Sequence, residues 1–230
     1  MVAYPYLLSS VILGIIWLIL FIRRKDLRKE MLIIGFIFIP SGLTQALYVP
    51  DYWQPRVIHQ FFGLFDIESL LHVFFIFGIA AVLYKEIKGY KLKRARGTKT
   101  TRISPHIIFC LGIFIGVVTV LFKVLLDVPF IHTSLFALML ISVYLILMRP
   151  DLFREIVWTS VIFSLLYISA TVMFNALFSF VANNWNPNGN WGIYLLGVPL
   201  EEYLYGLMVG IIGSVLYEEL TNMKLKKIKG

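Results

Sequence analysis

Two acidic segments of this chain resemble each other, and each one opens a hydrophobic stretch long enough to cross a membrane. The first begins Asp66-Ile67-Glu68-Ser69 and the second begins Pro199-Leu200-Glu201-Glu202, so an offset of 133 positions superimposes Glu68 on Glu201. A carboxyl group at membrane depth costs roughly 2.5 to 3.5 kcal/mol on insertion scales, so an acid present in both copies is a functional candidate. A low-dielectric setting favours the protonated form, which can donate a proton.

The residues one helical turn after these acids are also polar. Residues four apart lie on one face of a helix, so we expect Glu68 to lie over His72 and Glu201 over Tyr205. Each neighbour could relay a proton or simply hydrogen-bond its carboxyl group. Asn175, on the preceding hydrophobic stretch, could approach the second acid, although polar groups in membranes commonly serve helix-helix hydrogen bonds.

Glu202 falls on a different face from Glu201. It is in line with Gly206, Gly210 and Ser214, which place a small residue at every fourth position. Such a stripe is typical of close contact between two helices. We therefore expect tight packing against a neighbouring helix to keep Glu202 inside the protein and away from lipid.

The composition is that of a multi-pass membrane protein. Hydrophobic residues make up 59% of the 230 residues, charged residues make up 15%, and the mean hydropathy is +0.83. The single cysteine, Cys110, supports neither a disulfide within the chain nor a cysteine metal site. Metal-ligand spacing is also missing among the four histidines, so no metal is predicted; they are His59, His72, His106 and His132.

Seven hydrophobic runs approach the roughly 20 residues that a helix needs to cross a bilayer. The first run is followed by a basic cluster and has none before it, so we interpret it as a retained span and not as a cleaved signal peptide. The predicted spans are 5–22, 31–48, 67–84, 104–125, 130–148, 155–182 and 195–217.

Basic residues set the orientation of these spans, because Lys and Arg accumulate in cytoplasmic loops. Of the 21 Lys and Arg residues, all but Arg56 and Lys123 fall in segments that seven alternating spans place on one side. The N-terminus is therefore predicted outside and the C-terminus in the cytoplasm of a cell-membrane protein. The basic loop 88–102 is interpreted as a solvated segment that attracts anionic headgroups, and it is too short to form a nucleic-acid-binding domain.

Spans one to three and five to seven then form two three-helix repeats that point the same way, joined by the fourth span. The predicted fold is all-α, with a first repeat at 1–90, a basic loop and connecting helix at 91–128, and a second repeat with a basic tail at 129–230. Glu68 and Glu201 come to lie at the outer ends of spans three and seven. They are related by a pseudo-twofold axis along the membrane normal, as in parallel transporter repeats.

The motif Pro199-Leu200-Glu201-Glu202, with its echo in the first half, resembles that of a known family. The chain is similar to the integral-membrane, non-flavin lycopene cyclases of archaea, actinobacteria and fungal bifunctional cyclase/phytoene synthases. These carry a Pro-x-Glu-Glu or Pro-x-Glu-Asp motif in each of two homologous halves. The second half matches this motif fully, whereas the first has Asp66 in place of the proline and Ser69 in place of the second acid.

The resemblance implies a lycopene β-cyclase, an enzyme of carotenoid biosynthesis that isomerises its substrate without redox chemistry and without a cofactor. An acid would protonate the terminal double bond of lycopene, the carbocation would close the ring, and a base would remove a proton. Glu201 or Glu202 is then the expected general acid, and the other, or Glu68, is the expected base.

Aromatic faces can stabilise the intermediate cation. The residues expected to bind the substrate are Tyr203, Tyr205, His72, Asn175 and Pro199. The expected partners are lycopene entering from the bilayer, membrane lipid and, in a homo-oligomer, further copies of the chain; no nucleic acid is expected.

Three alternatives stay open: a cyclase of an elongated carotenoid, a hydratase of the terminal bond, and a proton-coupled transporter. A transporter normally has helices broken at mid-membrane, whereas both acids here lie at span ends. A rhodopsin is excluded because 195–217 contains no lysine, and a CAAX-type protease because Gly206 stands where its motif has arginine. No Gly-x-Gly-x-x-Gly turn supports a flavin or nicotinamide enzyme.

Overall fold

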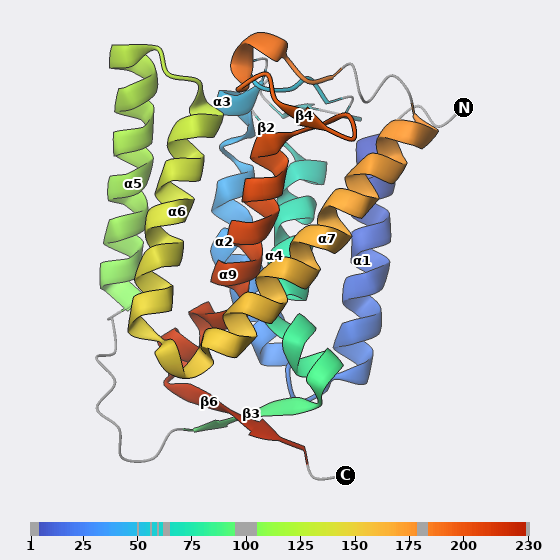
Figure 1. The fold of residues 1–230 in the computed structure, drawn as a ribbon, viewed down its shortest axis with the longest axis vertical. Helices are drawn as coiled ribbons and strands as arrows, with labels where there is room; N and C mark the ends of the chain where they lie inside the picture. Colours follow the sequence, from blue (N-terminus) through green and yellow to red (C-terminus); the bar gives the residue numbers. More distant parts are fainter. Residues whose placement is uncertain are drawn as a thin grey trace.

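The computed structural model describes residues 5–49, 51–55, 57–58, 60–61, 65–94, 105–178 and 184–228. For residues 60, 65 and 105–115 it describes the backbone only. The described chain is mostly helical (Figure 1). Its α-helices are α1 Pro5–Arg23, α2 Arg28–Gly42, α3 Gln45–Tyr48, α4 Ile67–Lys88, α5 Pro105–Leu126, α6 Phe130–Met148, α7 Phe153–Leu177 and α9 Leu200–Thr221. Two short 3-10 helices are η1 Pro150–Leu152 and η2 Pro187–Gly189.

Five helices in the described part of the chain are long and apolar enough to cross a membrane: α1, α4, α6, α7 together with η1, and α9. These five helices are candidate membrane spans, fewer than the seven spans expected from the sequence. Helix α2 has 15 residues, fewer than a span needs. In α5 the described apolar segment is Gly116–Leu126.

The predicted span 31–48 is interrupted in the structure. Helix α2 ends at Gly42 and α3 begins at Gln45, with Pro40 in the last turn of α2. Proline lacks the backbone N–H that would continue the helical hydrogen-bond ladder and crowds the preceding turn. After this proline, Leu43 and Thr44 form a turn whose N–H groups donate to the carbonyls of Pro40 and Ser41, and this turn separates α2 from α3.

Helices α4 and α9 form the centre of the bundle. Helix α2 packs along α4 and α7 packs along α9, while α1 contacts α4, α6 contacts α9, and α5 lies beside α6 (Figure 1). The two central helices cross closely at Gly213, where an added Cβ atom would lie only 2.7 Å from the Cβ of Ala80. By contrast, α1, α5, α6 and α7 expose many large apolar side chains, as a surface in contact with lipid does.

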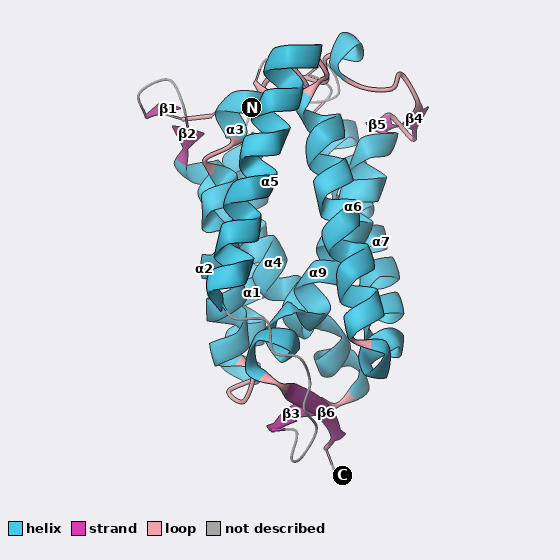
Figure 2. Cartoon of the chain, turned by 90° about the vertical axis from the view of Figure 1, so that its left-hand side faces the viewer, coloured by secondary structure: helices cyan, strands magenta, loops and turns pink. Residues whose placement is uncertain are grey.

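Three short antiparallel ribbons lie at the two ends of the bundle (Figure 2). One end carries β1 Gln60–Phe61 paired with β2 Phe65–Asp66, and β4 Tyr194–Leu195 paired with β5 Val198–Pro199. The other end carries β3 Tyr90–Arg94 paired with β6 Met223–Lys227. The ribbons add strands to the all-α architecture predicted from the sequence, but they only close the ends of the helical bundle.

The offset of 133 positions recurs in these elements. Helices α4 and α9 each have 22 residues. Each ends at a residue in the left-handed conformation, Gly89 with φ 66° and Asn222 with φ 55°. The strand that follows each helix pairs with its counterpart, and Leu92 lies opposite Leu225, which is 133 positions later. The two central helices and their strands are thus arranged about the Leu92–Leu225 pair.

Candidate active site at the hairpin end of the bundle

Glu202 lies in the first turn of α9, which follows Pro199 at the end of the β4–β5 hairpin. Both of its carboxyl oxygens accept hydrogen bonds from tyrosine hydroxyls. Tyr52, after α3, donates to Oε1 at 2.9 Å, and Tyr167 of α7 donates to Oε2 at 2.5 Å. The side chain is buried, so three separate segments of the chain enclose one carboxyl group.

Close packing of α9 on α7 places this group. A Cβ atom added at Gly210 would lie 2.5 Å from Cα of Ser160, and one added at Gly206 would lie 3.2 Å from Oγ of Ser164. The small-residue stripe is therefore a helix contact, as its spacing predicts. Because Glu202 continues this stripe by one turn, it faces α7 and not lipid.

Glu201 is fully buried and is bound through one oxygen. Its Oε1 accepts a hydrogen bond from the backbone N–H of Trp191 at 2.6 Å and lies 3.3 Å from Nε2 of His132. The His132 ring stacks on the Trp191 ring with centroids 5.1 Å apart. The other carboxyl oxygen of Glu201, Oε2, has no hydrogen-bond partner among the described residues. That oxygen can carry a proton without breaking an existing hydrogen bond.

Glu68 has a matching environment in the first half of the chain. Its Oε1 accepts from the backbone N–H of Ile58 at 2.9 Å, and its buried Oε2 lacks a partner in the described structure. Ile58 and Trp191 each precede their glutamate by ten residues, 133 positions apart. The two halves thus hold an acid in the same way, although Ser69 stands where the second half has Glu202.

Four aromatic rings lie in contact with one another between Glu68 and Glu202. His72 lies 5.6 Å from the Tyr6 ring and 6.5 Å from the Tyr167 ring, centroid to centroid, and Tyr205 lies 5.9 Å from Tyr167. Tyr6 also approaches the first half's motif, since its hydroxyl donates to Oγ of Ser69 at 3.4 Å. Of the residues expected to bind substrate, His72 and Tyr205 therefore belong to one aromatic group beside Glu202.

The other expected substrate-binding residues surround the β4–β5 hairpin. The hydroxyl of Tyr203 donates to the Leu195 carbonyl at 2.9 Å, and the amide of Asn175 donates to the Gly197 carbonyl at 3.1 Å. Pro199 is buried at the start of α9. The Asn175 amide thus binds hairpin backbone in this structure and not the acid that the sequence suggested.

Comparison with known proteins identifies the second half of the chain. Residues 129–220 match the family model described as lycopene cyclase. These residues are a lycopene cyclase family domain. The family expected from the motif is thereby confirmed for residues 129–220, and this domain supports the role of a carotenoid cyclase enzyme. Neither the curated proteins nor the solved structures gave a match.

The lycopene cyclase domain contains only part of the site. Glu201, Glu202, Tyr167 and His132 lie within 129–220. The remaining groups, Tyr52, Glu68, Tyr6 and His72, come from the chain before it. The two parts contact each other at the hairpin end of the bundle. There Trp53 and Trp185 form an antiparallel bridge, and the Asn186 N–H donates to the Tyr52 carbonyl at 2.8 Å.

Sequence reasoning did not identify Tyr52, Tyr167 or His132 as site residues. Tyr52 and Tyr167 are 150 and 35 positions from Glu202, and no local pattern links tyrosines at such distances to an acid. In the sequence, His132 is one of four histidines without metal-ligand spacing, and nothing local connects it with Glu201. Across the described residues, no group of three or more His, Cys, Asp or Glu side chains could hold a metal ion; His59 and Arg56 lie outside those residues.

Proposed function

We propose that this protein is a lycopene β-cyclase that converts the linear end group of lycopene into a β-ionone ring by acid catalysis. The observation that carries the proposal is the lycopene cyclase domain at 129–220, in which the acid pair Glu201-Glu202 opens a buried helix. Protonation of the terminal carbon-carbon double bond gives a carbocation, a second double bond attacks it to close the ring, and loss of a proton restores neutrality. Substrate and product are isomers, so the reaction needs no redox cofactor.

The hydrogen bonds support different roles for the two acids. Glu201 has one oxygen without a partner, so it is the better candidate for the undissociated general acid. Glu202 accepts from two phenols, and hydrogen bonds to a carboxylate favour its charged form. We assign Glu202 as the base that takes the proton from the cation. Glu68 is hydrogen-bonded in the same way as Glu201, and we propose it as a second general acid of the same site.

His132 supplies a route by which Glu201 regains its proton. The glutamate is fully buried, whereas the His132 side chain is 18% exposed and contacts it. Imidazole both accepts and donates protons near neutral pH. We propose that His132 passes protons from water to Glu201 between turnovers.

The rings beside Glu202 suit a carbocation, because an aromatic face attracts positive charge without forming a bond to it. Tyr167 and Tyr205 lie edge to face with centroids 5.9 Å apart, next to the acid that Tyr167 binds. We propose that these rings and His72 line the path of the carotene, which enters from the bilayer.

We further propose seven spans in two parallel repeats, 1–90 and 129–230, joined by a connecting segment at 91–128. The N-terminus lies outside and the C-terminus in the cytoplasm of the cell membrane. Support comes from paired contacts: Glu68 with Ile58 and Glu201 with Trp191 are each related by 133 positions. The acids then lie on the outer side and the β3–β6 ribbon on the cytoplasmic side.

The test is expression in a lycopene-accumulating host, followed by chromatography and mass spectrometry of the pigments. We expect products with β-ring spectra and the mass of lycopene, with conversion reduced about 100-fold or more in Glu201→Gln and Glu202→Gln. Glu86→Gln, at the opposite end of α4, serves as the control and keeps activity. A mass gain of one water would instead indicate a hydratase, and unchanged lycopene with well-folded protein would contradict the cyclase.

A further inference from the structure

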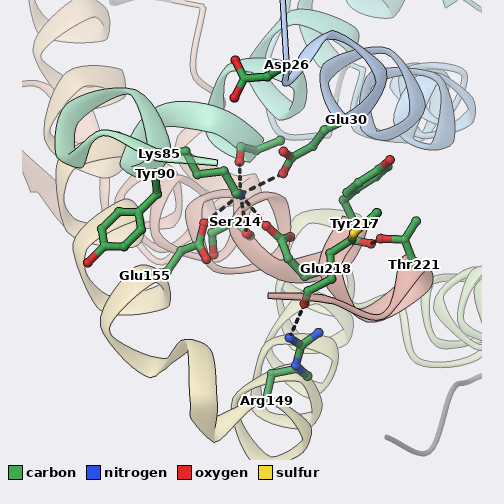
Figure 3. A network of polar contacts seen from close by, with 12 residues as sticks. Asp26, Glu30, Lys85, Tyr90, Arg149, Glu155, Ser214, Tyr217, Glu218 and Thr221 are labelled. Carbon is green, nitrogen blue, oxygen red and sulfur yellow. Dashed lines mark hydrogen bonds and ion pairs between the residues drawn. The ribbon is translucent and has the colours of Figure 1, made fainter. Parts of the chain in front are cut away.

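A second group of buried ionisable residues lies far from the site, near the β3–β6 end of the bundle. Lys85, in the last turns of α4, is fully buried, and its ammonium contacts three carboxyl groups (Figure 3). The distances from Lys85 Nζ are 2.8 Å to Glu30, 2.7 Å to Glu155 and 2.5 Å to Glu218. The three acids are 0 or 1% exposed and come from α2, α7 and α9.

These partners come in equivalent pairs from the two halves of the chain. Glu30 and Glu155 each lie six positions after an arginine, Arg24 or Arg149, that binds an aspartate two residues later through two parallel hydrogen bonds. Lys85 and Glu218 are themselves 133 positions apart on α4 and α9. The first half therefore supplies Glu30 and Lys85, and the second half supplies Glu155 and Glu218 at the corresponding positions.

Backbone carbonyls complete the same arrangement. Lys85 Nζ donates to the carbonyl of Ala81 at 2.8 Å and to that of Ser214 at 3.4 Å. Ala81 and Ser214 are again 133 positions apart. The residues directly before them, Ala80 and Gly213, form the close crossing of the central helices. The ammonium thus lies at the junction of the two halves and is shared almost evenly between them.

The cluster needs a cation for electrostatic reasons. A buried carboxylate without a positive partner is strongly unfavourable, and three carboxyl groups converge here around one ammonium. Among the charged groups described at this point, only Lys85 places a positive charge between all three. If its position were Glu, like the equivalent Glu218, four acids would meet with no counter-ion.

We propose that Glu30, Lys85, Glu155 and Glu218 form a single cation site that joins the two halves of the chain, and that the one ammonium it requires can be supplied from either half. The inference does not rest on carotenoid chemistry. An ordinary salt bridge of α4 would depend on lysine at position 85, whereas a shared site depends on one lysine at either of the two equivalent positions.

An exchange of the two residues tests this directly in the full-length protein. Lys85→Glu removes the cation, and we expect the unfolding temperature in detergent to fall by roughly 10 °C. The double variant Lys85→Glu/Glu218→Lys returns one ammonium from α9 and should regain more than half of that loss. Lys88→Glu, three residues later on α4, changes the same charge outside the cluster and should shift the temperature by no more than about 2 °C.

Two results would overturn the proposal. One is a Lys85→Glu variant as stable as Lys88→Glu, which would mean that the cluster needs no ammonium. The other is a double variant no more stable than Lys85→Glu alone, which would mean that the halves are not interchangeable. If Lys85→Glu does not fold, recovery of folded protein in the double variant supports the shared site, and failure of both variants to fold contradicts it.

Discussion

At the scale of single residues, the three acids at the hairpin end of the bundle differ in how their oxygens are bound. Glu202 has a phenol on each oxygen, whereas Glu201 and Glu68 each hold one backbone N–H and keep one oxygen without a described partner. The acids could be predicted from the sequence, because carboxyl groups are rare in apolar spans. Their phenolic partners could not, since Tyr52 and Tyr167 approach Glu202 only after the helices pack.

Removing the phenols should weaken catalysis while leaving the acid in place. A hydrogen bond to a charged group contributes about 1.5 to 3 kcal/mol, so we expect Tyr167→Phe to lower the cyclisation rate roughly 10- to 100-fold, with Tyr52→Phe acting in the same direction. Pigment conversion in isolated membranes measures the rate. Tyr84→Phe, at the opposite end of the bundle where the Tyr84 ring stacks on that of Tyr90, is the matched control. Equal rates in all three variants would remove the phenols from the mechanism.

The proton route through His132 predicts a rate that added imidazole can restore. We expect His132→Ala to slow turnover at least about 10-fold, and imidazole in the buffer to recover part of the loss. Thr133→Val, which removes a hydroxyl bound to the Phe130 carbonyl on the same helix, should neither lose activity nor respond to imidazole. A slow His132→Ala enzyme that imidazole does not accelerate would assign His132 a structural role only.

At the scale of helices and strands, hydropathy located the central helices well and their ends less well. The predicted span 67–84 corresponds to α4 Ile67–Lys88, and 195–217 corresponds to α9 Leu200–Thr221. The predicted span ends at 84 because basic residues usually mark loops, which leaves Lys85 outside it. In the structure three acids from other helices neutralise it, and α4 continues past it. Such compensation is tertiary and has no local signal.

The α7–α9 contact gives a prediction for the stripe of small residues. Gly210→Ala would bring a methyl group within 2.5 Å of Cα of Ser160, and such overpacking costs about 1 to 3 kcal/mol. Gly116→Ala on α5 meets nothing within 4 Å and should be neutral or stabilising, because alanine has the higher helix propensity. Thermal unfolding in detergent compares the two. If Gly210→Ala is as stable as Gly116→Ala, the close contact does not position Glu202.

At the scale of the whole molecule, the two halves repeat contacts as well as residues. Arg24 binds Asp26 and Glu86, and Arg149 binds Asp151 and Glu219. Each arginine also donates to the first residue of a ribbon strand, Tyr90 or Met223. In the turn between α1 and α2, hydrogen bonding to Arg24 lowers the pKa of Asp26 below its usual range.

The halves differ at both ends of the central helices. Ser69 replaces the second acid of the motif in the first half, so Glu202 has no counterpart, and Lys85 replaces Glu218 at the other end. The likeness of the two halves can be seen in a few matching residues of the sequence. These two differences lie at opposite ends of the central helices, at the start and near the end of α4 and α9.

The central claim, ring closure started by a proton that a buried carboxyl group exchanges with water, is tested most directly by isotope labelling. Membranes containing the protein would convert lycopene in D2O, and the cyclic product would be analysed by mass spectrometry. Because one hydrogen is added and a different one is lost, the account predicts a gain of about one mass unit for each ring formed. A cyclic product without deuterium, or recovery of lycopene alone, would contradict it.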